Sequence, residues 1–142
     1  IQGYFSGGKP SDEPVDGWMA TGDVGYISDE GFLYICGRVK DMIIRGGENV
    51  YPSEVEACLL ELPGCEETAV IGLPHDIWGE EVAAVIRMSY GQSSNASEVI
   101  AFCKERLAGW KGPAHVVSTD EPLERNALQK LLKAQIRERY FG

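Results

Sequence analysis

The chain has 142 residues, of which 44% are hydrophobic, and this balance predicts a folded domain rather than a disordered segment. No apolar run approaches the roughly 20 residues that a membrane-spanning helix needs, and no secretory signal pattern opens the chain. The net charge of −9 argues against nucleic acid as a partner, because nucleic-acid-binding proteins present basic surfaces.

The first 40 residues contain one clear structural signal, a β-hairpin. Residues 1–17 are rich in glycine and proline and predict a loop. Residues 18–27 and 32–37 are rich in aromatic and β-branched side chains, and they flank a turn sequence at residues 28–31. An isolated hairpin is unstable in water, so we expect this one to pack against a part of the protein outside the chain. Without that partner, its exposed aromatic rings favour self-association of the chain.

A second hairpin and a helix follow a charged break at residues 38–41. Residues 42–51 place two short apolar segments on either side of a Gly-Gly pair, which predicts a hairpin with a tight turn. The helical spacing of apolar residues then runs from residue 52 to residue 62. Ser53 and Glu56 match a capping box, so we expect Ser53 to cap this helix.

Two longer apolar runs, residues 68–73 and 82–88, predict strands, and residues 114–118 predict a third strand. Between the second and third strands, Asn95 and Glu98 indicate the cap of another helix. The apolar residues of that helix follow helical spacing, which predicts one buried face.

The last segment predicts an amphipathic helix. Its apolar residues fall on one side of the helix: Leu128, Leu131, Leu132, Ile136 and Tyr140. From residue 125 to residue 142, five basic residues accompany one acidic residue, a balance that suits a small anionic ligand but also describes a solvated helix face. Together, the elements after residue 41 predict an α+β fold, a small domain with a central three-stranded sheet flanked by helices.

The cysteines give information on the redox setting. Cys36, Cys58, Cys65 and Cys103 fit neither a zinc motif nor a dense disulfide framework. Cys58 and Cys103 fall on apolar helix faces, where cysteine acts as a small core residue. We therefore expect reduced thiols, no metal ligands and a cytoplasmic location.

Three segments resemble one family of enzymes. They are Gly17-Trp18-Met19-Ala20-Thr21-Gly22-Asp23, the stretch from Gly37-Arg38-Val39-Lys40-Asp41 through Gly46-Gly47-Glu48-Asn49-Val50-Tyr51-Pro52-Ser53-Glu54-Val55-Glu56, and Arg125-Asn126-Ala127-Leu128-Gln129-Lys130. In order and separation they resemble the adenylate-forming superfamily, which includes acyl-CoA synthetases, peptide-synthetase adenylation domains and luciferases. The resemblance extends over nearly the whole chain. Because the chain starts at Ile1 and not at a methionine, we also expect it to be part of a longer protein.

This resemblance implies that residues 1–39 are the tail of a large N-terminal domain, and that residues 40–142 are the C-terminal lid domain of an AMP-forming acyl-CoA synthetase. In such enzymes a carboxylate attacks the α-phosphate of Mg-ATP, which gives an acyl-adenylate and pyrophosphate. The lid then swings about a hinge, and the thiol of CoA, the co-substrate, attacks the acyl-adenylate. ATP and Mg²⁺ would bind mainly to the N-terminal domain, so we expect the isolated chain to be inactive.

The resemblance assigns Asp23 and Arg38 to nucleotide binding and Lys40 to the hinge. Asp23 matches an aspartate that accepts hydrogen bonds from the ribose hydroxyls, a role that suits a carboxylate. Arg38 matches an arginine that contacts the ribose or a phosphate through its planar guanidinium. Lys40 lies where the φ/ψ change of the hinge is concentrated. From the residues alone, Asp23 is also an ordinary turn residue, and Arg38 and Lys40 are also ordinary surface residues.

The resemblance also assigns CoA-binding residues. Gly46 and Gly47 match glycines that let the pantetheine arm pass close to the backbone, although a plain hairpin turn needs glycine as well. Trp78 matches an aromatic residue that lies against the CoA adenine, and the alternative is a partly buried loop tryptophan. The family often has a basic residue where this chain has Ala114, near the CoA phosphates. We therefore expect Lys111 to contact the phosphates instead.

Lys130 matches the lysine that bridges the carboxylate and the α-phosphate in the first step, and we expect it to be the catalytic residue of the chain. From the residues alone it is also one of several basic residues on an amphipathic helix. The family motif usually reads Leu-Pro-Arg-Asn-x-x-Gly-Lys, but here Glu124 replaces the proline and Gln129 the glycine. Because Gln129 lies three residues after Asn126, we expect these two residues to form a capping box that starts the helix just before Lys130.

The favoured function is that of a part of an ATP-dependent carboxylate–CoA ligase. Two alternatives stay open: an adenylation domain that loads a carrier protein, and a non-catalytic interaction module that reuses the lid fold. Trp78 favours CoA over a carrier protein as the acceptor. The family's phosphate loop and acyl pocket are absent from the sequence, so the carboxylic acid has to be found by experiment.

Overall fold

The computed structural model describes residues 4–6, 9–11 and 18–142. The chain divides into two compact units, residues 1–40 and 41–142, and the division falls one residue after the boundary expected from the sequence. Among the described residues, no helix is both long enough and apolar enough to cross a membrane.

The first unit begins with a short hairpin that the sequence analysis missed. β1 (Tyr4–Ser6) pairs with β2 (Lys9–Ser11) in antiparallel fashion, so the predicted loop is wrong for these residues. Strands of three residues are too short to show an alternating pattern. The rest of segment 1–17, including Gly17 of the first motif, lies outside the described residues.

The predicted aromatic hairpin is confirmed. β3 (Asp23–Ile27) pairs with β4 (Leu33–Arg38), although β3 begins at Asp23 rather than at Trp18. The rings of Tyr26 and Tyr34 stack across the strands, with their centroids 5.2 Å apart. Six neighbouring apolar side chains of this hairpin are exposed: Tyr26, Ile27, Phe32, Leu33, Tyr34 and Ile35. Exposed apolar side chains gathered on one hairpin are typical of an interface with another part of a protein.

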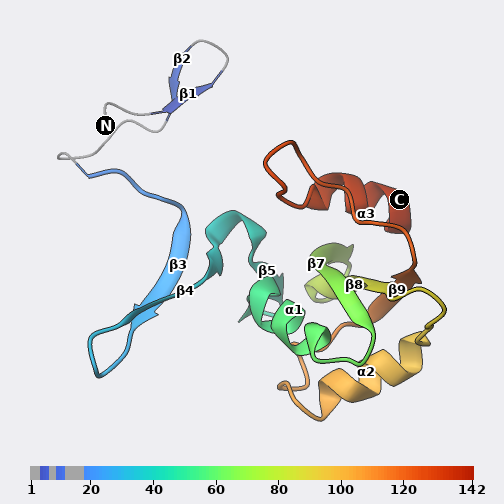
Figure 1. Ribbon diagram of the computed structural model, residues 1–142. Coiled ribbons are helices and arrows are strands. Elements are labelled where there is room, and N and C mark those ends of the chain that lie inside the picture. The colour runs from blue at the N-terminus through green and yellow to red at the C-terminus, as the bar shows by residue number, and fades with distance from the viewer. Residues whose placement is uncertain (1–3, 7–8, 12–17) are drawn as a thin grey trace. The chain divides into compact units, whose positions relative to one another are not determined.

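The second unit is built on a five-stranded sheet (Figure 1). Its strands are β5 (Ile43–Arg45), β6 (Glu48–Val50), β7 (Cys65–His75), β8 (Gly79–Met88) and β9 (His115–Thr119). β7 and β8 form a long antiparallel hairpin, β9 joins β8 in parallel, and the β5–β6 hairpin joins β8 through the pair Arg45–Gly79. The α+β class is confirmed, but the predicted number of three strands is wrong. The β5–β6 hairpin was not predicted to join the sheet, because its pairing with β8 links residues far apart in the sequence, which no local pattern relates.

β7 and β8 are longer than their apolar runs predicted. β7 continues through Pro74 to His75, and β8 starts at Gly79, so the expected connection shrinks to a short turn. β7 lies at an edge of the sheet. Proline is tolerated on an edge strand, because its missing N–H can point away from the sheet.

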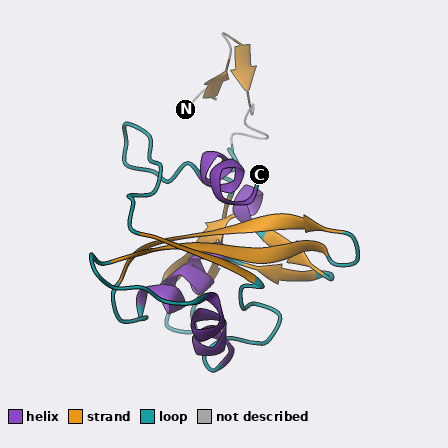
Figure 2. Cartoon of the chain, turned by 90° about the vertical axis from the view of Figure 1, so that its right-hand side faces the viewer, coloured by secondary structure: helices purple, strands orange, loops and turns teal. Residues whose placement is uncertain are grey.

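Helices cover both faces of this sheet (Figure 2). α1 (Pro52–Leu60) and α2 (Ala96–Lys104) pack on one face, and α3 (Lys133–Phe141) packs on the other through Ile136. Four alternate residues of β8 enter the first core: Val82, Ala84, Ile86 and Met88. Val85 enters the second core, beside α3. Burial on both faces explains why this strand reads as a continuous apolar run.

The two predicted capping boxes of α1 and α2 have different outcomes. That of α2 is confirmed: Glu98 N donates to Asn95 Oδ1 at 2.9 Å, and Asn95 N donates to Glu98 Oε2 at 3.4 Å. The predicted capping box of α1 is wrong. Tyr51 is the N-cap and its side chain makes no capping hydrogen bond, while Ser53 lies inside the helix. The Glu56 carboxylate instead accepts a hydrogen bond of 3.0 Å from a backbone N–H of β7. The Glu56 side chain, which the capping box requires, is therefore engaged in a tertiary contact with β7.

The predicted core positions of Cys58 and Cys103 are confirmed, because both side chains are buried. No disulfide joins the cysteines of the described residues. Burial raises the pKa of the Cys103 thiol to about 12, and it also raises the pKa of Cys58 and Cys65. These three thiols are therefore protonated and weakly nucleophilic near neutral pH.

Candidate functional site

The two residues assigned to the nucleotide lie side by side at the open end of the β3–β4 hairpin. Asp23 and Arg38 are partners in the strand register, and Arg38 Nε donates to Asp23 Oδ1 at 3.1 Å. Asp23 N donates to Thr21 Oγ1 at 3.1 Å, and Val39 N donates to Gly22 O at 2.8 Å, which closes the backbone around the pair. Both charged side chains are partly exposed. The pair thus presents a carboxylate and a guanidinium together, groups that suit hydroxyl and phosphate oxygens.

Lys40, the predicted hinge, is the last residue of the first unit. It lies in the 3₁₀ helix η1 (Val39–Asp41), and its side chain is exposed. Short 3₁₀ turns are common connectors between larger elements. The hinge role itself stays a prediction.

Gly46 and Trp78 meet although they are distant in the sequence. Gly46 N donates to the Trp78 carbonyl at 2.8 Å, and a Cβ at Gly46 would lie 2.9 Å from Trp78 Cε3, so only glycine fits beneath this ring. Gly46 and Gly47 have φ of +60° and +88°, the backbone that a two-residue hairpin turn requires. The turn alone therefore accounts for both glycines, and the indole contact adds a second requirement at Gly46.

The indole of Trp78 forms one wall of a pocket of about 250 Å³. The pocket is lined by Arg45, Gly46, Glu48, Trp78, Gly109 and Trp110. Trp78 and Trp110 are 48% and 45% exposed, so both rings are accessible. Arg45 Nη1 donates to the Trp110 carbonyl at 2.9 Å, which ties the loop of Trp110 to β5. Two accessible indoles around a small pocket suit a flat aromatic base.

The sequence analysis gave no role to Trp110 or Arg45. The contact between them spans 65 residues, so no local spacing relates them. The one available signal was the position of Trp110 next to Lys111, a residue that the sequence analysis had assigned to the CoA phosphates.

His75 holds the turn that carries Trp78. His75 Nδ1 accepts hydrogen bonds from Ile77 N and Trp78 N, each at 3.2 Å, so this nitrogen carries no proton. His75 Nε2 lies 3.7 Å from Glu81 Oε1 on β8. The orientation of the Trp78 turn therefore depends on a side chain of the strand that precedes it.

Lys111, predicted to contact the CoA phosphates, has a different partner. Its Nζ donates to both carboxylate oxygens of Glu54, at 2.7 and 2.8 Å. The ion pair joins the loop of Lys111 to α1. An ammonium has three N–H donors and Glu54 engages two of them, so the contact of Lys111 with the CoA phosphates stays a prediction.

Lys130 lies in a loop and not on a helix. α3 begins at Lys133, and an isolated bridge between Arg125 and Leu131 closes the loop that leads into it, drawn red-orange in Figure 1. The Lys130 side chain is exposed, and it has no hydrogen-bond or ion-pair partner among the described residues. Its ammonium is therefore available to an anion.

Asn126 organises this loop from the inside. Its Oδ1 accepts hydrogen bonds from Leu128 N and Lys130 N, both at 2.9 Å, and its backbone N donates to Lys130 O at 2.9 Å. The predicted capping box of Asn126 and Gln129 is therefore wrong. The asparagine side chain satisfies the backbone of a closed loop, and no helix starts there.

Gln129 adopts a left-handed conformation, with φ at +63°. Glycine, the usual residue of the family motif, adopts it without strain. We predict that Gln129→Gly raises the free energy of unfolding by up to about 1 kcal/mol, because relief of about 1–2 kcal/mol of strain is partly offset by the freedom of glycine in the unfolded chain. Denaturant titration of both chains measures the change. A decrease would show that the Gln129 side chain stabilises the loop through a contact.

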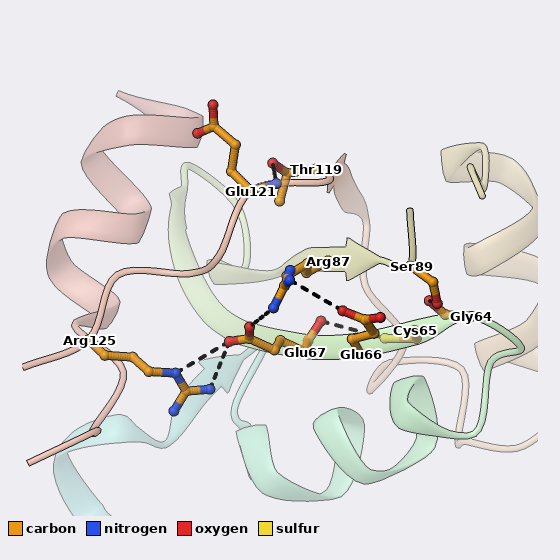
Figure 3. Close-up of polar contacts among 9 residues, drawn as sticks. All are labelled: Gly64, Cys65, Glu66, Glu67, Arg87, Ser89, Thr119, Glu121 and Arg125. Carbon is orange, nitrogen blue, oxygen red and sulfur yellow. Dashed lines mark hydrogen bonds and ion pairs between the residues drawn. The ribbon is translucent and has the colours of Figure 1, made fainter. Parts of the chain in front are cut away.

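Arg125 ties the loop to the sheet (Figure 3). Its Nη1 donates to the Gln129 carbonyl at 2.8 Å, while its Nη2 and Nε donate to Glu67 Oε2 at 2.8 and 3.3 Å. The other oxygen of Glu67 accepts a hydrogen bond of 2.5 Å from Arg87 Nη1. Burial by itself would raise the pKa of the Glu67 carboxyl, but the two arginines outweigh it and hold this pKa below its ordinary value. The carboxylate is therefore ionised near neutral pH.

A family model described as the AMP-binding enzyme C-terminal domain matches residues 54–130, more than half of the chain. The chain belongs to this family. The match begins in α1 and ends at Lys130, so it contains the Trp78 turn and the loop from Arg125 to Lys130.

Relatives of this AMP-binding enzyme C-terminal domain are longer proteins. The chain is 44% identical over 137 residues to the 2-succinylbenzoate–CoA ligase of Geobacillus kaustophilus, and 47% identical over 125 residues to the long-chain-fatty-acid–CoA ligase FadD13 of Mycobacterium tuberculosis. These alignments take in 96% and 88% of the chain but 28% and 24% of the two ligases. The chain thus spans about a quarter of the length of the curated relatives that it matches.

A solved structure has the same fold. The o-succinylbenzoate CoA synthetase MenE from Bacillus subtilis, in complex with the acyl-adenylate intermediate OSB-AMP, matches with a TM-score of 0.79 and 44% identity. The match covers 87% of this chain and 25% of MenE. Another structure of MenE is a complex with ATP and a magnesium ion.

In the AMP-binding enzyme C-terminal domain and the hairpin that precedes it, the structure brings some of the predicted residues together. Asp23 lies beside Arg38, and Gly46 lies beneath Trp78. Lys130 lies apart from both pairs in sequence, on its own loop. Each group has its own supporting contacts, so each can be tested separately.

Proposed function

We propose that the chain is the C-terminal part of an ATP-dependent carboxylate–CoA ligase, an enzyme that forms an acyl-adenylate and then an acyl-CoA thioester. Residues 1–39 would end the large N-terminal domain, and residues 40–142 would form the lid, with the hinge at Lys40. Membership of the family and the likeness to named CoA ligases support this proposal. The N-terminal domain of the same enzyme would be the main partner of the chain, and it would hold most of the contacts to ATP, Mg²⁺ and the acid.

The observation that carries the proposal is the position of two groups at opposite ends of the β7–β8 hairpin. Glu67 anchors the Lys130 loop, and it lies eight residues along β7 from His75, which holds the Trp78 turn. At about 3.3 Å per residue, this separation is about 26 Å. A single active centre cannot engage both ends in one orientation of the lid. Two groups so placed suit two successive reactions, with a rotation of the lid between them.

In the first reaction, Lys130 would place its ammonium between the carboxylate and the α-phosphate. Its accessible charge would offset the negative charge that the two groups bring together. Asp23 would accept hydrogen bonds from the ribose hydroxyls, and Arg38 would donate to ribose or phosphate oxygens. All three residues act by position and charge, and none of them forms a covalent bond.

In the second reaction, the pocket of Trp78 and Trp110 would receive the adenine of CoA. The Gly46–Gly47 turn would let the pantetheine arm pass, and a Cβ at Gly47 would have no neighbour within 4 Å, so this side of the turn is open. Both ATP and CoA are cytoplasmic metabolites, so the proposal places the enzyme in the cytoplasm.

Replacement of Trp78 by alanine in the full-length enzyme tests the acceptor. We expect the KM for CoA to rise about 5- to 150-fold, because stacking of a base on an aromatic ring contributes about 1–3 kcal/mol. The KM for pantetheine, which has no adenine, should stay close to that of the unmodified enzyme. Tyr90→Ala is the matched control, since Tyr90 is an aromatic residue that is 99% exposed and lies outside the pocket.

Assays of the unmodified full-length enzyme, with CoA and with a carrier protein as acceptors, separate the alternative functions. If the unmodified enzyme transfers its acyl group to a phosphopantetheinyl carrier protein and not to CoA, the chain belongs to an adenylation domain. If the full-length protein forms no acyl-adenylate with any carboxylic acid tested, the lid fold serves a non-catalytic role. Either result would overturn the proposal of a CoA ligase.

A further inference from the structure

The Lys130 loop lies outside the helices and strands, and side-chain contacts add to the few backbone hydrogen bonds that close it. The peptide group that joins Gln129 to Lys130 is held at both of its polar atoms. Its N–H donates to Asn126 Oδ1 at 2.9 Å, and its carbonyl accepts from Arg125 Nη1 at 2.8 Å. The orientation of this peptide plane sets the direction in which the Lys130 side chain leaves the backbone.

Asn126 and Arg125 differ in how they are fixed. The asparagine is short and lies within the loop that it closes. The arginine has a long, flexible side chain, and its guanidinium would sample several positions without a partner. Glu67 supplies that partner, because one of its carboxylate oxygens binds both Nη2 and Nε of Arg125.

Glu67 is itself held in place. It lies on β7, its side chain is 16% exposed, and its second oxygen is bound by Arg87 from the neighbouring strand β8 (Figure 3). A planar guanidinium on each side leaves the carboxylate little freedom. A chain of polar contacts therefore runs from Arg87 on β8 through Glu67 and Arg125 to the carbonyl next to Lys130.

We propose that Glu67 is a positioning residue for the adenylation reaction, which orients Lys130 through Arg125. The inference rests on the proposed function, because it requires Lys130 to act on the substrates. Glu67 touches no substrate in this arrangement. Its effect follows from geometry, since a misplacement of about 1 Å in a reacting group can lower a rate by about 10²-fold.

The chain offers a matched control on the same strand. Glu66 is the neighbouring carboxylate, and it pairs with Arg87 at 3.4 Å. Among the described residues its ion pair reaches Arg87 and not Arg125, and its side chain is 44% exposed. Glu66→Gln therefore removes a carboxylate from the same arginine without disturbing the contact with the loop.

The experiment measures both half-reactions of the full-length enzyme in the variants Glu67→Gln, Glu66→Gln and Lys130→Ala. We expect Glu67→Gln to lower the kcat of ATP–pyrophosphate exchange about 10- to 100-fold, while the KM for ATP stays the same. The amide keeps the shape of the side chain but removes the charge that fixes Arg125. Thioester formation from a supplied acyl-adenylate, which does not use Lys130, should stay within about twofold, as should both reactions of Glu66→Gln.

Arg125→Lys gives an independent measurement, because an ammonium keeps the charge but cannot bind Glu67 and the Gln129 carbonyl in the same fork geometry. It should reproduce the selective loss of exchange. Equal losses in both half-reactions of Glu67→Gln would mean a general structural role and would overturn the inference. So would exchange in Glu67→Gln that matches that of Glu66→Gln. If Lys130→Ala itself keeps full exchange, the failure lies in the proposed role of Lys130, and the inference falls with it.

Discussion

Replacement of Lys130 by alanine in the full-length enzyme is expected to lower ATP–pyrophosphate exchange by about 10²- to 10³-fold, because a positioned donor at a developing charge commonly contributes about 3–4 kcal/mol. The structure suits this role, since the Lys130 side chain is exposed while its backbone is held by Asn126. Attack of CoA on a supplied acyl-adenylate should change far less. In that reaction the Trp78 end of the lid, and not the Lys130 end, would lie at the active centre.

The control for Lys130 is Lys104→Ala, which removes an exposed lysine from the end of α2, outside every site described above. It should leave both half-reactions unchanged. If Lys130→Ala slows the two half-reactions by the same factor, Lys130 is not specific to adenylation and its assignment is wrong. The altered motif around Gln129 would then not support the adenylation role that the resemblance assigns to Lys130.

Gly47→Leu is expected to have the opposite selectivity, with thioester formation lowered by about 10²-fold and pyrophosphate exchange largely preserved. A Cβ at Gly47 would have no neighbour within 4 Å, so a leucine side chain there would project into open space without moving Trp78. In the proposed second reaction the pantetheine arm occupies that space. Gly46 is a poorer choice, because any side chain there would displace the Trp78 indole and confuse the two effects.

The strain of a side chain at positive φ needs its own control. Gly47 has φ of +88°, where an L-residue costs about 1–2 kcal/mol. Gly91→Leu imposes a similar strain, since Gly91 has φ of +78° and also has nothing within 4 Å of its Cβ position. Measurement of both half-reactions for both variants isolates the effect of bulk. Loss of thioester formation in Gly91→Leu as well would point to a destabilised lid and against a blocked path for the thiol.

Elements with strong local signals could be predicted from the sequence. The Gly-Gly hairpin and the Asn95–Glu98 capping box each depend on residues within a few positions of one another, and the structure has both. The same rule failed for α1, where Glu56 binds β7, and for the segment after Asn126, where a closed loop forms in place of a helix. In both cases a polar side chain found a partner that the local motif does not include.

Periodicity and turn chemistry act between near neighbours, so the α+β class, the order of the main helices and strands, and the motifs that contain the site residues could be predicted from the amino-acid sequence. Which side chains meet depends on the folded chain. Arg125 binds Glu67 across 58 residues, Arg45 binds the carbonyl of Trp110 across 65, and Lys111 binds Glu54 across 57. These contacts follow from the register of the sheet and the packing of helices on its faces. No spacing rule relates residues so far apart. The contact of Arg125 with Glu67, which supports the Lys130 loop, and the place of Trp110 in the Trp78 pocket could therefore be found only from the folded structure.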